Sequence, residues 1–175
     1  MELVDANPLI AVIQAGDPIR IQIPAAGINP VGAIKPAAQD HIGLVPSLRF
    51  DTGVDMVAGV ALAIPDKADR SIDVACRVGW GETSGAGNVV YNIYYKWLTE
   101  DTVLDSAADG TLSDTVAVNT TVKGYTFTSI TIPAPSSTDR VLEVQIERNG
   151  ANVLDTSAGA AHVIGILFDF TAGTN

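Results

Sequence analysis

The sequence contains little cysteine and few basic residues, and both shortages exclude classes of protein. One cysteine, Cys76, stands among 175 residues, and it can form neither an internal disulfide nor a thiolate-based zinc cluster. The ten basic residues are outnumbered by twenty acidic ones, which gives a net charge of −10, and they are scattered singly along the chain. Phosphate binding needs clustered Lys and Arg, so we expect no nucleic-acid partner.

Charged residues and long apolar runs are also scarce. Only 17% of the residues are charged, below the roughly 25% of an average soluble domain, although 47% are hydrophobic. The longest apolar runs, residues 57–64 and 163–168, are far shorter than the roughly 20 residues that span a bilayer, and the acidic N-terminus lacks the basic start of a secretory signal. We therefore expect no membrane partner. We predict that other protein chains cover the apolar surface, as in a homo-oligomer or a larger assembly.

The chain does not keep the 3.6-residue periodicity of a helix, whereas alternation with a period of two residues recurs throughout. It is clearest at residues 71–80, where one face carries Ile72, Val74, Cys76, Val78 and Trp80. Further strands are expected at residues 19–23, 54–64, 88–98, 116–122, 125–132, 140–148 and 162–170. Such strands, separated by Gly, Pro and Asp clusters, predict an all-β fold: a single β-sandwich of the jelly-roll or Greek-key type.

Some of these strands carry more detailed predictions. Residues 116–122 and 125–132 are expected to pair with each other. The strand 88–98 is apolar on both faces, so a loop or a neighbouring subunit must cover its outer face. The residues of this possible subunit interface are Val90, Tyr94 and Leu98. In the strand 162–170, the side chains expected to share the core face are Ile164, Ile166, Phe168 and Phe170.

Residues 1–45 differ from the rest, because a nearly uncharged apolar segment is interrupted by Pro8, Pro18, Pro24, Pro30 and Pro36. This proline density excludes a central strand and favours an extended arm, in which residues 19–23 alternate as in an edge strand. We therefore divide the chain into an N-terminal arm, residues 1–45, and a sandwich domain, residues 46–175. The arm either covers its own sandwich or reaches a neighbouring subunit. Its expected contact residues are Leu9, Ile13, Ile19, Ile21, Ile23, Ile28, Val31 and Ile34.

Residues suited to catalysis are few. His41 and His162 are the imidazoles available for nucleophilic hydrolysis, and no Gly-x-Ser-x-Gly motif accompanies them. Glycine-rich fragments at residues 79–81 and 85–87 do not complete the G-x-G-x-x-G pattern of nucleotide sites. We therefore predict no catalytic residues, no enzyme activity and no bound cofactor.

One expected loop is acidic and contains no basic residue; its carboxylates are Glu100, Asp101, Asp105, Asp109 and Asp114. Hard cations such as calcium bind several carboxylates at a turn, but the spacing here does not match an EF-hand loop. The prediction is therefore a solvated loop and no metal site, and cation binding stays open as the alternative.

Aromatic side chains gather at Tyr91, Tyr94, Tyr95 and Trp97, and exposed aromatic rings can stack on sugars. Alternation places at least half of them in the core. A carbohydrate platform on this strand is therefore kept as an alternative.

The order of these features is similar to that of a known family. In chain order, they are a Gly-rich turn entering an aromatic strand at 87–91, an acidic loop with Leu104-Asp105, a Thr-rich strand ending at Pro133, the alternating segment 139–148, Asp155-Thr156 and the apolar strand 163–168. Over residues 48–171 the chain resembles a diffuse family of small β-sandwich virion proteins, which tailed bacteriophages encode among their head and tail structural genes.

The resemblance implies a structural role in the virion. The expected protein is a trimer on the capsid surface that decorates and stabilises the head by binding the major capsid protein. The resemblance supplies no catalytic residue and does not extend to the arm. The alternative is a tail-fibre or receptor-binding module that contacts host glycans. Deletion of residues 1–40 is expected to leave a soluble sandwich that no longer binds capsids.

Overall fold

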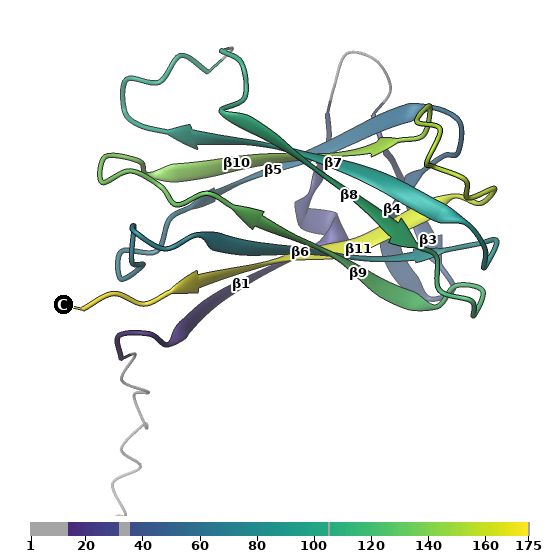
Figure 1. Cartoon of the computed structure of the whole chain (residues 1–175), viewed down its shortest axis with the longest axis horizontal. Helices are drawn as coiled ribbons and strands as arrows, with labels where there is room; N and C mark the ends of the chain where they lie inside the picture. The colour runs from purple at the N-terminus through teal and green to yellow at the C-terminus, as the bar shows by residue number, and fades with distance from the viewer. Residues whose placement is uncertain (1–13, 32–35, 105, 175) are drawn as a thin grey trace, which may run out of the picture.

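The protein is a sandwich of two antiparallel β-sheets (Figure 1). The computed structural model describes residues 14–31, 36–104 and 106–174. Sheet A has the order β3-β4-β11-β6-β9, with β1 also paired to β11, and sheet B has the order β2-β5-β10-β7-β8. The strands of sheet A are β1 (Pro18–Pro24), β3 (Ala38–Ile42), β4 (Val45–Phe50), β6 (Val74–Glu82), β9 (Tyr125–Ile132) and β11 (Ala161–Thr171). Those of sheet B are β2 (Asn29–Pro30), β5 (Asp55–Ala63), β7 (Asn88–Leu98), β8 (Gly110–Ala117) and β10 (Val141–Asn149).

This architecture confirms the predicted all-β sandwich. The chain passes repeatedly from one sheet to the other, as in jelly-roll folds, because strands that follow one another in sequence often lie in opposite layers. The described part of the chain has one 3-10 turn, η1 (Ala25–Gly27), and none of its elements is a helix of the length and apolarity needed to cross a bilayer.

The core lies between the two sheets and is built by the apolar side of each alternating strand. On β6 the predicted inward residues Val74, Cys76 and Val78 are buried together with Trp80, whereas Ile72 precedes the strand and is exposed. Trp80 packs edge-on against Tyr91 of β7 with ring centroids 5.5 Å apart. Burial raises the pKa of the Cys76 thiol to about 12. Cys76 therefore acts as a small apolar core residue.

The described part of the expected arm belongs to the sandwich itself. β1 pairs with β11 from Pro18↔Thr171 to Pro24↔Gly165, and the side chains of Ile19, Ile21 and Ile23 pack against the core. β4 pairs with the first residues of β11, so the remaining edge of β11 is available to β1. Ile28 is completely enclosed, at 1% exposure.

The boundary expected at residue 45 therefore does not separate two structural units in the described chain. β3 and β4 form a hairpin across it, with Ala38 opposite Arg49 and Ile42 opposite Val45. The physical reason is that the apolar residues between the prolines alternate, and alternating apolar residues are buried best as strands of the existing sandwich.

The predicted pairing of residues 116–122 with 125–132 is wrong. β8 ends at Ala117 and pairs with β7, whereas β9 pairs with β6 in the other sheet. The intervening residues cross between the sheets through a turn, in which Gly124 N–H donates to the Thr121 carbonyl and Lys123 has a φ of 62°. The two segments lie in different sheets, so they cannot pair as a hairpin.

One residue of the predicted inward face of β11 is also misplaced. Val163, Ile166 and Phe168 are buried, but Ile164 lies on the outer face. The pairing with β6 shifts register between Val163 and Gly165, which is the signature of a β-bulge. The extra residue moves Ile164 out of phase with the residues that follow it.

Candidate functional site

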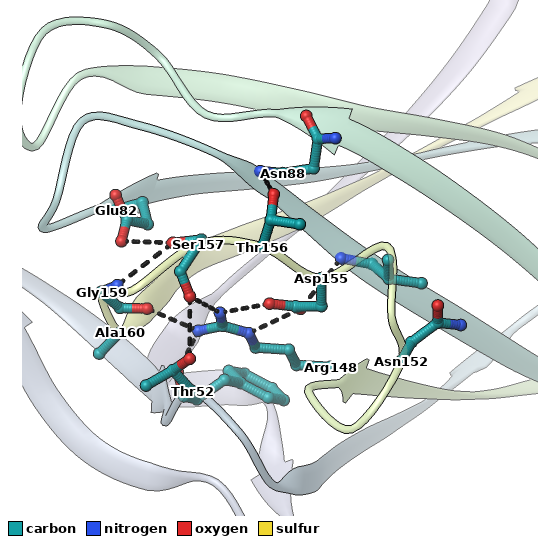
Figure 2. Close-up of polar contacts among 12 residues, drawn as sticks. Thr52, Glu82, Asn88, Arg148, Asn152, Asp155, Thr156, Ser157, Gly159 and Ala160 are labelled. Carbon is teal, nitrogen blue, oxygen red and sulfur yellow. Dashed lines mark hydrogen bonds and ion pairs between the residues drawn. The ribbon is translucent and has the colours of Figure 1, made fainter.

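A buried ion pair closes one end of the sandwich (Figure 2). Arg148 and Asp155 are both completely buried, and the guanidinium binds the carboxylate through Nε at 3.0 Å and Nη2 at 2.8 Å. Its other N–H groups donate to the carbonyls of Phe50, Gly159 and Ser157. All five donors of the guanidinium are therefore satisfied, and none is left for a ligand.

Glu82 extends this network toward the next turn. One carboxylate oxygen accepts from the Ser157 hydroxyl at 2.7 Å, and the other accepts from the backbone N–H groups of Ser84 and Gly85. Burial alone would raise the pKa of Glu82, but these hydrogen bonds outweigh it and lower the pKa. Because the network is enclosed and its groups are paired, it holds the loops after β6 and β10 in place and is not a binding site.

A second polar cluster surrounds His162 at the start of β11. Its Nδ1 lies 3.0 Å from the hydroxyl of Ser47, and both residues are buried. A hollow of about 440 Å³ lies beside the imidazole and includes Asp40 and Arg49. Burial lowers the pKa of His162. A serine hydroxyl beside an imidazole is the pairing of a nucleophile and its base. Ser47 is 0% exposed, however, so its hydroxyl cannot reach a substrate.

The acidic loop is held by a lysine that the sequence analysis did not single out. Lys96 of β7 is buried, and its ammonium group donates to the carbonyls of Val103, Leu104 and Ser106 at 2.8–3.1 Å. These three bonds use all the donors of the ammonium group. The backbone carbonyls of the loop therefore fasten it over β7.

The carboxylates of this loop do not converge. Asp109 accepts from the backbone N–H of Trp97, and Asp114 lies on β8 facing Tyr91 across the strands. Asp105 lies outside the described residues. Among the side chains that the structure does describe, no three His, Cys, Asp or Glu residues are grouped so that they could hold a metal ion.

A polar groove crosses the outer face of sheet B. It consists of two adjoining hollows of about 250 and 170 Å³ that share Glu143 and Gln145 of β10. The first continues over Tyr94 to the acidic loop, and the second continues over the small residues Gly59 and Ala61 of β5. Nearby, Glu147 accepts hydrogen bonds from Asn92 at 2.8 Å and from the Tyr94 hydroxyl at 2.5 Å. Burial and this bond raise the pKa of Tyr94.

A different hollow lies on the outer face of sheet A, with a volume of about 270 Å³. We call it the aromatic hollow, and its lining is Arg20 and Gln22 of β1, Arg77 and Gly79 of β6, Tyr125 and Phe127 of β9, and residues 164–167 of β11. Tyr125 is 51% exposed and Phe127 is 46% exposed, and their rings meet edge to face with centroids 4.6 Å apart. These two rings are the aromatic members among the large exposed apolar side chains of the described chain, which makes this face a candidate interaction surface.

Two arginines border the aromatic hollow and share one carboxylate. Arg20 Nε donates to Asp169 Oδ1 at 2.6 Å, and Arg77 Nη2 lies 3.4 Å from Asp169 Oδ2. The three charges leave a local excess of one positive charge in a chain of net charge −10. The aromatic hollow therefore differs in charge from the protein as a whole.

The residues predicted to contact other chains do not share one exposed surface in the structure. In the possible interface on β7, Tyr94 and Leu98 are half-buried, whereas Val90 is buried at 3% exposure. Residues 155–157 hydrogen-bond to the backbone of β7 at and beside Val90. Val90 is therefore covered by a loop of its own chain, which was one of the two expectations.

Among the arm residues, Ile19, Ile21, Ile23 and Ile28 contact the core, and Val31 lies beside the groove at Gly59. Leu9, Ile13 and Ile34 lie outside the described residues. Of the aromatic cluster on β7, Tyr91 is fully buried, and Tyr95 and Trp97 pack against the core, as the alternation predicted for at least half of them.

The residues of the aromatic hollow were not predicted from the sequence, although the sequence contains a signal for them. In β9, Tyr125 and Phe127 are in phase with Ser129 and out of phase with the buried Ile132. Two aromatic residues on the polar side of an alternating strand therefore indicate an exposed apolar patch. The arginines carry no such local signal, because Arg20 and Arg77 meet only through the pairing of β1 and β6 with β11.

No family model and no curated protein matches the sequence. Several solved structures share the fold. A CBM35 from Cellvibrio japonicus Abf62 aligns with a TM-score of 0.53 and 11% identity over 90% of this chain and 100% of that one. The CBM36-1 domain of a multidomain xylanase from the hindgut metagenome of Trinervitermes trinervoides aligns with a TM-score of 0.52 and 6% identity over 86% and 96%.

A third structure, the Arthrobacter globiformis T6 isomalto-dextranase complexed with panose, aligns with a TM-score of 0.51 and 17% identity over 85% of this chain. This chain spans 23% of that enzyme. At these identities the likenesses establish the class of fold, a β-sandwich of the kind found in carbohydrate-binding modules, and nothing more specific.

Proposed function

We propose that this protein is a structural component of a tailed-phage virion, which forms a trimer and decorates the capsid by binding the major capsid protein. Three observations support the proposal: the resemblance over residues 48–171, the low charge fraction of 17%, and an exposed apolar surface on the outer face of sheet A. The surface carries the proposal, because it provides a place at which another protein can bind.

The chemistry of the aromatic hollow suits a contact between proteins. Tyr, Phe and Arg are enriched in the centres of such interfaces, and Tyr125, Phe127 and Arg77 occur together here. β1, which belongs to the segment expected to be an arm, contributes its outward residues Arg20 and Gln22 to this surface, because its isoleucines pack against the core. A contact built on two aromatic anchors gains stability from buried apolar area at roughly 25 cal/mol per Å², offset by the entropy of association.

The test uses capsids assembled from the major capsid protein encoded in the same genome. The wild-type protein is expected to sediment with these capsids, and the double variant Tyr125→Ala/Phe127→Ala is expected to remain in the supernatant. Val153→Ala/Leu154→Ala is the matched control, because it removes two exposed apolar side chains from the loop after β10. Localisation of the protein to the tail in imaged virions, or no binding to capsids, would overturn the proposal.

A second candidate is a virion module that contacts host glycans. The polar groove on sheet B favours it, since carboxylate, amide and phenol groups line an open channel. The shared fold with carbohydrate-binding modules is compatible with it. A glycan array separates the two candidates: array binding that Gln145→Ala removes, together with absence from the capsid lattice, would favour the glycan module.

A further inference from the structure

The aromatic hollow combines positive charge with apolar surface in a chain that is otherwise acidic. The sequence holds six arginines, and two of them, Arg20 and Arg77, border this single hollow. They share one carboxylate, that of Asp169, whose side chain is 13% exposed. We propose that the aromatic hollow binds a segment of a partner protein in which a carboxylate stands beside an apolar side chain. This inference rests on the proposed function and names the chemistry of the partner at that face.

Both arginines have donors available for a second carboxylate. A guanidinium carries five N–H groups, and Asp169 engages Nε of Arg20 and Nη2 of Arg77. The side chains of Arg20 and Arg77 are 57% and 45% exposed, so the rest of each fork faces solvent beside the hollow. Asp169 also holds the two guanidinium groups next to each other. A carboxylate that enters the hollow therefore meets two positioned guanidinium groups.

The apolar part of the hollow is the reason for proposing an apolar side chain beside the partner's carboxylate. The Tyr125 ring lies over Gly79, where a Cβ atom would come within 2.9 Å of its Cζ. Phe127 lies beside it, and Leu167 of β11 lines the same hollow. The Tyr125 ring fills the space over Gly79 and the Ile23 backbone fills the space over Gly165, so an apolar residue of a partner would pack against the two aromatic rings and Leu167.

The geometry of the rings favours a peptide over an acidic sugar. Sugars stack on flat aromatic faces, whereas Tyr125 and Phe127 meet at an angle of 74° and offer one edge and one face. Such a corner suits a branched or aromatic side chain, which packs against both rings. The hollow is locally positive, whereas the protein as a whole is acidic. A second copy of this chain would therefore bind here only if it inserted one of its own carboxylates into the hollow.

The experiment compares two probes that differ in a single group: N-acetyl-Leu-Glu-Phe-amide and N-acetyl-Leu-Gln-Phe-amide. Both are titrated into the full chain and followed by two-dimensional NMR of the backbone amides. The Glu peptide is expected to bind about 5-fold more tightly than the Gln peptide, because the two arginines are half exposed and an ion pair at such a site contributes at most about 1 kcal/mol. Shifted amides should lie at Gly79 and Gly165, and high salt should reduce the difference.

Variants assign the effect to named residues. Arg20→Gln/Arg77→Gln is expected to remove the preference for the Glu peptide while retaining weak binding of both. The matched control is Arg140→Gln, an exposed arginine before β10 whose partners are the carbonyls of Ser137 and Asp139. Tyr125→Ala/Phe127→Ala is expected to weaken both peptides alike.

Equal affinity for the two peptides, or an unchanged preference in Arg20→Gln/Arg77→Gln, would overturn the inference. Tighter binding of a glucuronic-acid oligosaccharide with the same arginine dependence would overturn it in favour of an acidic glycan. The capsid assay distinguishes this failure from that of the proposed function. If the wild type does not bind capsids, the proposed function fails whatever the peptides do, whereas capsid binding that is unchanged in Arg20→Gln/Arg77→Gln contradicts this inference alone.

Discussion

Arg148 at the end of β10 and Asp155 in the following loop form a completely buried, two-point ion pair, with N–O distances of 2.8 and 3.0 Å. The pair joins two residues seven positions apart and closes the loop between them against the end of the sandwich. Asp155 Oδ2 also accepts from the backbone N–H of Val90, so the same carboxylate joins the loop to β7.

Removing one partner of this pair is expected to be costly. Asp155→Ala leaves the Arg148 charge buried without compensation, which is expected to lower the free energy of unfolding by about 3–5 kcal/mol. Urea denaturation followed by tryptophan fluorescence measures the effect, and Asp66→Ala, at an exposed acidic residue, is the control. A loss below about 1 kcal/mol, the upper range of an exposed pair, would show that the loop opens readily to water.

His162 is expected to make stability fall as the pH falls below 6.5, the ordinary pKa of a histidine. Burial lowers its pKa in the folded state below the ordinary value of 6.5, so the unfolded chain binds a proton more readily. The contribution is complete above pH 6.5 and is lost as the pH falls toward the folded-state pKa, by at most about 1.4 kcal/mol per pH unit.

His162→Gln is therefore expected to flatten this part of the stability curve, measured as the free energy of unfolding at several pH values. His41→Gln, at the exposed histidine of β3, is the matched control for the substitution itself. The same slope in His162→Gln as in the wild type would assign the dependence to other groups.

Gly79 offers a test of the aromatic hollow that does not remove any side chain. In Gly79→Ala the new methyl group is too close to the Tyr125 ring, whose outer end must move. Because Tyr125 is half exposed, the movement is expected to change the melting temperature little. Capsid binding is nevertheless expected to fall several-fold. Unchanged binding would show that the position of the Tyr125 ring does not matter to the partner.

Deletion of residues 1–24 is expected to destabilise the sandwich, contrary to the behaviour of a free arm. It removes three isoleucines that pack against the core, and partial burial of each contributes about 1 kcal/mol, so the expected loss is about 3 kcal/mol. It also leaves the edge of β11 from Gly165 to Thr171 unpaired, which favours aggregation. Thermal unfolding and size-exclusion chromatography measure both effects.

The control for the deletion of residues 1–24 is a chain that begins at residue 14, because it retains every described strand. A stable, monodisperse chain beginning at residue 25 would instead support the arm as a separate unit.

Local alternation was enough to predict much of the fold. The expected strands 88–98 and 125–132 match β7 and β9 residue for residue, and the inward face of β6 is correct from Val74 to Trp80. Prediction failed for β3 and β4, which were not expected, and for β8, which lies at Gly110–Ala117 rather than at 116–122. It also failed at the bulge beside Ile164, which does not follow from the pattern of apolar residues.

The candidate site was harder to predict than the strands. Aromatic residues on β7 drew attention in the sequence, but most of them fill the core, while the exposed pair lies on β9. Lys96 and Arg148 are two of the singly scattered basic residues, and in the structure both are buried and each holds a loop through several hydrogen bonds. A single long side chain with several donors can close a loop, and sequence spacing does not show which carbonyls it reaches.

By itself, the sequence determined the class of fold, the strand that buries Cys76 and the net negative charge, because period-two alternation acts locally along the chain and net charge follows from composition. Tertiary structure alone decided that Arg20, Arg77 and Asp169 would meet beside Tyr125. These residues come from four strands separated by up to 149 positions, and only the pairing of β1, β6 and β9 around β11 brings them onto one face.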